Sequence, residues 1–428
     1  LARSLVGTEG GAFIVYRRDR MTSWLADQLR NDVPWPQIVT QLIAAEGLWT
    51  DCPQSNFITN AQIPDEGIDE NQLAGRTVRA FLGQRMDCAQ CHDHPFDPRW
   101  KQPDFEGLAA FFGQVNVNIG GVTDVEMRDR EPVEYYVVDP GHEGEGRLIA
   151  PQVPFHADWL PTSGSRRSRL AAWVVHPDNR RFERAIANRI WGLMFGSPLH
   201  DPVDDLPHPD DSTEPDALDL LGKSFRNHDA KLSSLIRVIA ASDVFRLSSE
   251  EDGLETEEQY LLSREQWAIF PLVRLRPEQI VGSLNQVGSV RTIDQDSHLF
   301  VRIGRVTSEN DFLREYGDLG DEELLQQVGT IPQALLRMNG KFTREAIRTE
   351  LLTSATQLIN YSPTDQALIE NIYLTCLTRY PSTPEKEERL QELNSLHTDP
   401  EDQARSRREF VTDLYWTLLN STEFSWNH

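Results

Sequence analysis

The stretch Cys88-Ala89-Gln90-Cys91-His92-Asp93-His94-Pro95 lies near the end of the first quarter of the chain, and the other segments are most easily interpreted from it. It contains the pattern C-x-x-C-H, which places two thiols and an imidazole within about one helical turn. The chain has four cysteines and eleven histidines among 428 residues. At those frequencies the pentapeptide arises by chance in about one such chain per thousand. The pattern therefore indicates a functional site.

C-x-x-C-H is the pattern by which haem is attached covalently to a chain. Two thiols at this spacing can form thioethers with the two vinyl groups of one haem, and the imidazole that follows can bind the iron. We therefore predict haem c, with Cys88 and Cys91 attached to it and His92 as its axial ligand.

The sequence does not identify a distal ligand for that haem. Met86 and His94 are too close to His92 along the chain to reach over the ring easily. Met127, Met194 or a distant histidine are the remaining candidates.

Other chemistry fits the same residues. Cys88 and Cys91 can form a redox dithiol, a small structural disulfide or a pair of buried thiols. They can also be two ligands of a zinc site that His92 or His94 completes. Pro95 favours an extended conformation at His94, so both imidazoles can converge on one ion. These alternatives stay open beside haem.

The composition limits the partners of the chain. Asp and Glu number 67 against 42 Lys and Arg, which gives a net charge of −25. A nucleic-acid-binding protein would carry a basic face, and anionic lipid would repel this chain, so we expect neither partner. Such acidity is typical of solubility, or of an encounter with a basic protein or a cation.

Export is the expected location. No run of eighteen apolar residues occurs, so we expect no membrane span. The sequence starts at Leu1 without an initiator methionine or a leader, and we expect a signal peptide or a further part of a longer protein upstream. Cys52 and Cys376 could then form a long-range disulfide, which the sequence cannot test.

Hydrophobic periodicity predicts a mainly α protein: two helical domains with a small β-rich insertion. Residues 1–113 form the first domain, 114–160 the insertion and 161–428 the second domain. Pro36 favours the first turn of a helix, and a helix over about 69–86 leads to the cysteines. Alternating residues around Gly120-Gly121 and over 133–138 indicate strands.

A second concentration of imidazoles and carboxylates runs from His200 to Asp211. It could bind calcium or a transition metal, but its spacing matches no calcium loop. We interpret it as an acidic loop before a helix that Ser212 or Thr213 caps. A hydrolase that uses Asp204, Asp205 and His208 in a cleft between the domains is a further hypothesis, so enzymatic activity stays open.

Several stretches together resemble a tandem found in large planctomycete proteins: the planctomycete cytochrome-like domain and then a second domain of unknown function. The stretches are YRR at 16–18, FLGQRMDCAQCHDHPFD at 81–97, HPDN at 176–179, ANRIW at 187–191, RPEQ at 276–279, QAL at 333–335, RYP at 379–381 and LNSTEF at 419–424.

The resemblance implies an exported protein, periplasmic or otherwise extracytoplasmic, whose partner is a redox protein or an upstream cytochrome domain. We therefore predict a c-type cytochrome-like redox module. The alternative is an extracytoplasmic interaction or scaffold module, with a zinc or structural site at Cys88, Cys91, His92 and His94. The resemblance extends past His92 to Asp97, further than haem attachment requires, which favours a metal or structural role for the added residues.

Overall fold

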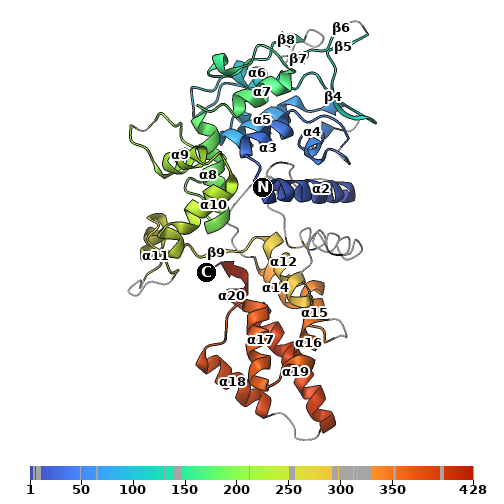
Figure 1. Cartoon of the computed structure of the whole chain (residues 1–428), viewed down its shortest axis with the longest axis vertical. Coiled ribbons are helices and arrows are strands. Elements are labelled where there is room, and N and C mark those ends of the chain that lie inside the picture. The colour runs from blue at the N-terminus through green and yellow to red at the C-terminus, as the bar shows by residue number, and fades with distance from the viewer. Residues whose placement is uncertain are drawn as a thin grey trace. The chain divides into compact units, whose positions relative to one another are not determined.

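The structure is a computed structural model (Figure 1). The described residues form two compact units, unit 1 up to residue 247 and unit 2 from residue 248 on. Helices dominate both units, which confirms the predicted mainly α class. The structure describes residues 1, 2, 5, 11–48, 50–63, 66–129, 131–138, 146–211, 213–249, 256–291, 297, 312, 316, 330–349, 353–395 and 400–427, without the side chains of 11–19, 400–403 and 427.

Unit 1 begins with helices separated by prolines. Helix α2 (Gly11–Arg30) is followed by α3 (Trp35–Ile43), which has Pro36 in its first turn, as predicted. The Trp35 amide donates to the carbonyl oxygen of Ala230 at 2.9 Å, so the start of α3 is tied to the end of the unit. Short elements follow: η1 (Pro53–Ser55), α4 (Asn56–Thr59), β1 (Gln62–Ile63) and β2 (Gly67–Ile68).

Helices α5 (Glu70–Leu82) and α6 (Gln102–Ala109) lie on either side of the cysteine stretch, which contains the 3-10 turn η2 (Asp87–Gln90). Asp69 caps α5 by accepting the Gln72 amide at 2.9 Å. The helix ends four residues earlier than the predicted 86, because Gly83 adopts a left-handed conformation with φ 61°.

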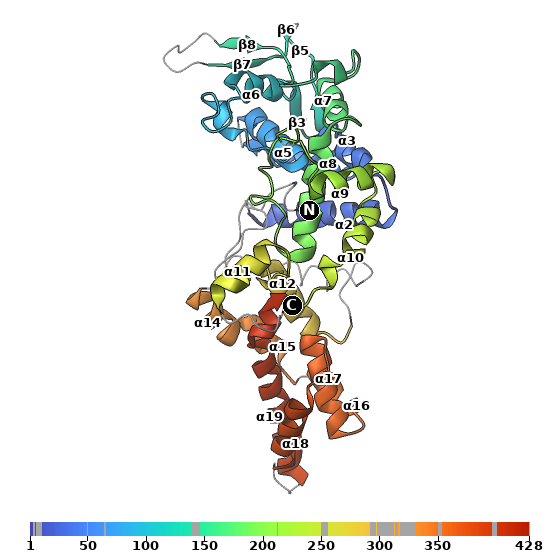
Figure 2. The same cartoon turned by 90° about the vertical axis from the view of Figure 1, so that its left-hand side faces the viewer.

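The predicted β-rich insertion is present as separate hairpins. Its strands pair two by two: β3 (Val115–Asn118) with β4 (Gly121–Asp124), β5 (Met127–Arg128) with β6 (Glu131–Pro132), and β7 (Tyr135–Val137) with β8 (Arg147–Ile149). Tyr135 and Ile149 are buried opposite each other, whereas the next pair, Tyr136 and Leu148, is exposed. This alternation is typical of an antiparallel strand pair with one face packed on the core and the other exposed to solvent. Both views place β7 and β8 close to α6 (Figures 1 and 2).

Unit 1 continues with η3 (Ala157–Trp159), α7 (Arg166–Val174), α8 (Arg180–Phe195), α9 (Ala217–Asn227), α10 (Leu232–Ala241) and η4 (Val244–Arg246). Gly196 ends α8 in a left-handed conformation, as is typical of a glycine after a helix. Asp216 is the cap of α9, accepting the Asp219 amide at 2.8 Å. The prediction of a cap at Thr213 is therefore wrong, and Ser212 lies outside the described residues.

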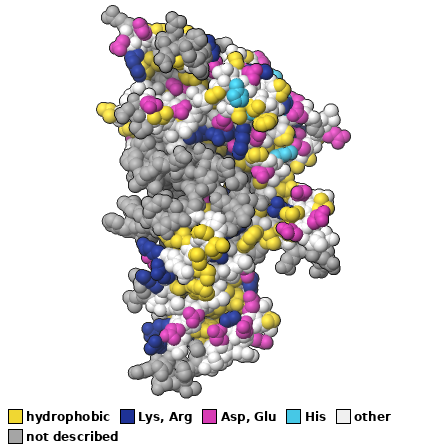
Figure 3. Space-filling model, turned by 180° about the vertical axis from the view of Figure 1, so that it is seen from behind, with side chains coloured by type: hydrophobic (Ala, Val, Ile, Leu, Met, Phe, Trp, Pro, Cys, Tyr) yellow, Lys and Arg dark blue, Asp and Glu magenta, His cyan; other side chains and the backbone are white. Residues whose placement is uncertain are grey.

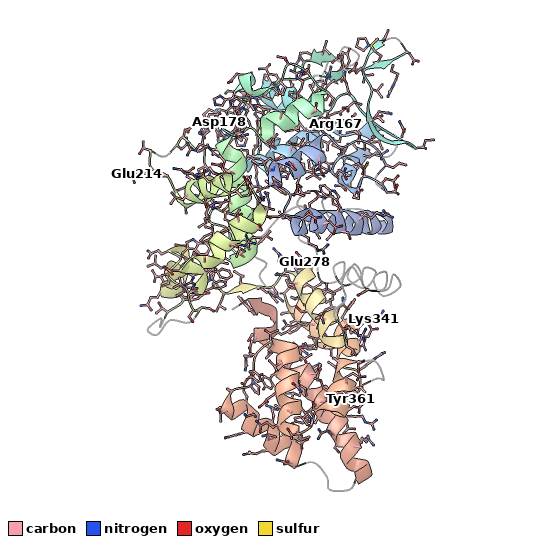
Figure 4. All side chains as sticks on the ribbon, in the orientation of Figure 1. Arg167, Asp178, Glu214, Glu278, Lys341 and Tyr361 are labelled. Carbon is pink, nitrogen blue, oxygen red and sulfur yellow. The ribbon has the colours of Figure 1, made fainter. Side chains whose placement is uncertain are left out.

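A buried arginine joins segments that the sequence placed in three different domains. Arg167 of α7 is fully buried (Figure 4). It donates to the Asp124 carboxylate in β4 at 2.7 Å and to the carbonyl oxygen of Ala45, just after α3, at 2.5 Å. The boundaries predicted near residues 113 and 160 thus lie inside unit 1.

Unit 2 contains α11 (Glu257–Glu265), β9 (Val273–Arg274), α12 (Pro277–Gly288), α14 (Ile331–Asn339), α15 (Lys341–Ala346), α16 (Ser354–Tyr361), α17 (Asp365–Leu377), α18 (Thr383–Asn394), α19 (Pro400–Leu419), α20 (Thr422–Ser425) and β10 (Trp426–Asn427). Leu284, Ile369 and Val411 are fully buried in one core that α12, α17 and α19 share. No helix in the described part of the chain is long and apolar enough to cross a membrane.

Candidate functional site

The cysteines lie on a short exposed turn. Residues 87–90 form η2, in which the Ala89 amide donates to the Met86 carbonyl oxygen at 2.8 Å. Met86 and Ala89 are buried and anchor the turn. Cys88 and Cys91 are exposed, and both are free thiols. The turn therefore presents both thiols to the surface, and the prediction that they lie in one turn of chain holds.

His92 follows the cysteines with its ring exposed. Its Nδ1 lies 2.7 Å from the backbone carbonyl oxygen of Asp93. A carbonyl oxygen only accepts hydrogen bonds, so Nδ1 carries the proton in this contact. In the neutral ring, Nε2 is then the nitrogen with the free lone pair. Metal-binding histidines commonly hold their other ring N–H in this way, which fixes the tautomer and the ring orientation.

His94 is engaged in the opposite sense. Its Nδ1 accepts the backbone N–H groups of Asp97, at 3.0 Å, and of Phe96, at 3.4 Å. A backbone amide only donates, so Nδ1 is unprotonated here and the neutral ring carries its proton on Nε2. A metal bound at Nε2 would require the other tautomer, whose Nδ1–H would face two amide donors. His94 is thus arranged to form a turn.

The same turn occurs at two other His-Pro steps in unit 1. The Nδ1 of His176 accepts the Asp178 amide at 3.3 Å, and the Nδ1 of His208 accepts the Asp210 amide at 3.1 Å. In each case a proline follows the histidine, and the donor is the amide two residues after it. Since these sites share the turn without the cysteines, His94-Pro95 is explained by local backbone geometry.

Asp93, between the two histidines, holds the start of α6. Its carboxylate accepts the Gln102 amide at 3.1 Å and the Lys101 ammonium at 3.0 Å. The hydrogen bond from Gln102, followed by that from Lys101, lowers the pKa of Asp93. These contacts hold Asp93 in place, and with it the Asp93 carbonyl oxygen that accepts the hydrogen bond from His92.

The acidic loop after α8 packs directly against this stretch. Arg85 and Asp204 form an ion pair at 2.8 Å, and Arg99 bridges Asp97 and Asp211, each at 2.8 Å. A backbone hydrogen bond also links the two segments: the Leu206 amide donates to the carbonyl oxygen of Gly83 at 2.8 Å. The loop that the sequence singled out thus braces the cysteine stretch.

Gly83 has to be a glycine at this junction. A Cβ on it would lie 2.9 Å from a methyl carbon of Leu206, and its φ of 61° disfavours side chains in any case. The side-chain amide of Gln84 donates to the Leu206 carbonyl oxygen at 2.9 Å, which adds a second hydrogen bond between the two segments. The close approach of the two segments therefore depends on Gly83.

Arg181 of α8 is a buried arginine close to the end of the cysteine stretch. It is 5% exposed, and its guanidinium lies 5.1 Å from the ring centroids of Trp100 and of Phe155. Burial, and then the charge of Arg99, lowers its pKa to about 10. Sequence reasoning missed Arg85, Arg99 and Arg181, since no local pattern connects them to Asp204, Asp211 and Trp100, which are far away in the sequence.

Several other predicted residues have structural surroundings. Met86 is buried, and Met127 is exposed on β5. Met194 is half-buried in α8. None of the three is shown to face His92, so the distal ligand stays a prediction. Cys52 and Cys376 are both free thiols, and Cys376 is buried in α17.

Two of the residues named in the hydrolase hypothesis bind other groups of the chain. Asp204 is committed to Arg85, and the Nδ1 of His208 to the Asp210 amide. Within the described ranges, no group of three or more His, Cys, Asp or Glu side chains is placed to hold a metal ion.

Comparison with protein families finds two matches, in tandem. Residues 11–117 match PSCyt2, described as a protein of unknown function (DUF1549), and residues 166–298 match PSD1, described as a protein of unknown function (DUF1553). The cysteine stretch lies in the first match and the acidic loop in the second. Neither the curated proteins nor the solved structures give a match. The chain thus contains a DUF1549 segment followed by a DUF1553 segment, and the names of the two families hint at a cytochrome-like module.

Proposed function

We propose that this chain is an extracytoplasmic c-type cytochrome-like redox module, with haem attached at Cys88 and Cys91 and His92 as axial ligand. The observation that carries the proposal is the hydrogen bond from His92 Nδ1 to the Asp93 carbonyl oxygen. It leaves Nε2 as the ligating nitrogen and orients the ring. Asp93 is in turn held by Gln102 and Lys101, so the ligand has a rigid support.

The surface around the motif suits an apolar group. Both thiols are exposed and free, which haem attachment requires. Phe96, in the same stretch, is 90% exposed although its ring is fully apolar. Its nearest ring contact is the edge of His94, at 6.2 Å between centroids. A haem on this surface would cover apolar area that is otherwise left in water.

Attachment needs no oxidant. Cys88 and Cys91 would each hold the haem by a thioether formed when the S–H adds to a vinyl group, so that sulfur and hydrogen both end on the former vinyl carbons. When bound, haem supplies one-electron exchange. Cys88 and Cys91 would hold it by two thioethers and His92 by its imidazole, whose orientation is fixed by the hydrogen bond to the Asp93 carbonyl oxygen.

The net charge of the chain favours a particular kind of redox partner. At a net charge of −25, the chain favours encounter with a basic redox protein or a basic cytochrome domain. No described helix spans a membrane, and the extracytoplasmic location is part of the proposal.

A zinc or purely structural site at the same motif is the competing function. The engagement of His94 Nδ1 with two backbone amides weighs against a zinc site that needs both imidazoles. It supports a structural role for residues 93–99, which join α6 and the acidic loop to the cysteine turn. We therefore assign ligand binding to residues 88–92 and bracing to residues 93–99.

The test is to produce the chain in a host with a c-type maturation system and to measure its mass by mass spectrometry after denaturation. The proposal predicts that the mass rises by one haem, and that the Cys88→Ser/Cys91→Ser variant from the same host lacks this rise. A single zinc per chain, lost in the same variant, and no haem in either would favour the alternative. The variant's fold is checked by circular dichroism, and exposed thiols make a folding defect unexpected.

A further inference from the structure

The most unusual charge in unit 2 is the guanidinium of Arg337, on α14. The residue is 9% exposed. Its Nε and Nη1 are buried without an acceptor, and its Nη2 reaches the Asn420 carbonyl oxygen only at 3.4 Å. No ion pair of Arg337 occurs among the described residues. A buried guanidinium with two unmatched nitrogen atoms is therefore built into this unit.

Such an arrangement is costly unless something compensates for it. An arginine stays charged at any ordinary pH, and a buried charge without a partner destabilises a fold. Burial lowers the pKa of Arg337, and the positive charge of Arg274 also disfavours its charged form. The chain has 67 carboxylates and provides them to other buried arginines: Arg167 has Asp124, and Arg184 has Asp216. Arg337 has no such partner among the described residues, and unlike the buried Arg181, which lies over two aromatic rings, it leaves two nitrogen atoms without an acceptor.

A second arginine nearby is bound only by neutral groups. Arg274 of β9 donates to the Tyr316 hydroxyl at 2.8 Å and to the Gln333 side-chain oxygen at 3.1 Å. Gln333 precedes Arg337 by four residues, so the two share a face of α14. Nothing in the described part of the chain supplies Arg274 with a carboxylate. Arg274 lies close enough for its charge to act on Arg337, and neither guanidinium has a carboxylate partner among the described residues.

The elements that carry these residues meet at one end of unit 2. Strand β9 pairs with β10, directly after α20, and Asn420 lies between α19 and α20. Figure 1 places β9, α14 and the C-terminal residues at this end, and Figure 2 shows α14 and the C-terminal residues there as well. On the face of the molecule seen in Figure 3, hydrophobic side chains reach the surface among basic and acidic ones.

We propose that Arg337 and Arg274, with the Tyr316 hydroxyl, form a binding site for an oxyanion, a carboxylate or a phosphate group. An unmatched N–H group of Arg337 would donate to an oxygen of the anion, which would supply an acceptor that the fold lacks. A cation is excluded by two positive charges, and an apolar ligand would leave both nitrogen atoms unsatisfied. Guanidinium groups and hydroxyls are the donors that proteins use for such anions. The site is independent of the haem proposal.

The experiment is a thermal-unfolding titration of the full chain with sodium phosphate and, separately, sodium acetate, each against sodium chloride at equal ionic strength. The site predicts a saturable rise in Tm of about 5–10 °C at a hundredfold excess over Kd. The anion that saturates at the lower concentration identifies the ligand as phosphate-like or carboxylate-like. Isothermal titration calorimetry of the wild-type chain gives the stoichiometry, expected to be one.

Variants separate this site from general salt effects. Arg337→Met and Arg274→Gln should each lose the anion-dependent rise, whereas Arg344→Met, which removes an exposed arginine on the neighbouring helix α15, should keep it. Two results would overturn the site: no anion-dependent rise in the wild-type chain, or an equal rise in Arg337→Met. Arg274→Gln and the wild-type calorimetry decide the question if Arg337→Met does not fold.

Discussion

The cysteine turn at 88–92 and the segment at 93–99 lie next to each other and use similar side chains in different ways. In the turn, Cys88 and Cys91 are exposed free thiols, and His92 bonds only a carbonyl oxygen with its Nδ1. In the segment, His94 receives two backbone amides, and Asp97 holds Arg99 with both carboxylate oxygens. The turn leaves its thiols and the Nε2 of His92 available to a ligand, whereas the polar atoms of the segment bind other groups of the chain.

The comparison shows that adjacent histidines can be assigned different roles from the partner of one ring nitrogen. A carbonyl partner leaves Nε2 of His92 able to bind iron, while amide partners bind His94 into a turn. The recurrence of that turn at His176 and His208 supports the structural assignment of His94.

The largest expected effect is on the thiols. Replacing Cys88 and Cys91 by serine should abolish covalent haem entirely, while the free energy of unfolding of the haem-free protein should change by no more than about 0.5 kcal/mol, since both side chains are exposed. Haem staining after denaturing electrophoresis and urea unfolding measure the two quantities. A large loss of stability without haem would mean that these thiols are structural.

Exchanging the two histidines sharpens the comparison. His92→Ala should alter the visible absorption spectrum of the haem protein, because the axial ligand is removed, whereas His94→Ala should leave the spectrum unchanged. Spectra of both variants, oxidised and reduced, provide the measurement. If His94→Ala changed the spectrum and His92→Ala did not, the assignment of roles would be reversed.

The structural role of His94 predicts an intermediate effect. His94→Ala should lower the free energy of unfolding of the haem-free protein by about 1 kcal/mol, because the Asp97 amide loses a hydrogen bond at 3.0 Å. Urea unfolding tests this. His176→Ala, which removes the same turn away from the cysteines, should cost a similar amount, and an unchanged stability in both variants would refute the shared role.

The smallest effect concerns pH. Burial first, and then the charges of Arg181 and Arg99, lower the pKa of His208 below its ordinary value of 6.5. The folded state thus disfavours protonated His208, so stability is unaffected above about pH 6.5 and falls as the pH drops below that value. Protonation would also place a hydrogen on the Nδ1 that accepts the Asp210 amide.

His208→Asn should therefore reduce the loss of stability between about pH 7 and about pH 5, by under about 1 kcal/mol. Urea unfolding at both pH values gives the difference. An equal acid sensitivity in the variant and the wild-type chain would show that His208 does not contribute to it.

Local signals allowed much of the fold to be predicted. Asp69, Pro36 and Gly196 each lie at a helix end where the sequence indicated one, since caps and breakers act within a few residues. The β insertion followed from alternation, although the sequence could not show that its strands would pair only two by two. The chemistry of the cysteine turn also lay in five consecutive residues.

The rest of the site depends on long-range contacts. Arg85 and Asp204 are 119 residues apart, and Arg99 and Asp211 are 112 apart, so no local pattern connects them. The role of His94 was equally hidden, since the expected convergence of both imidazoles on one ion depends on which ring nitrogen the backbone engages. That choice is made by the folded path of residues 94–97.

The central claim is that Cys88, Cys91 and His92 hold haem. The pyridine haemochrome spectrum of the chain, made with a c-type maturation system, tests it most directly. We predict the spectrum of a haem with two thioether bonds, at one haem per chain. No haem absorbance from a chain that is folded, and that was exported alongside a maturing control cytochrome, would contradict the account.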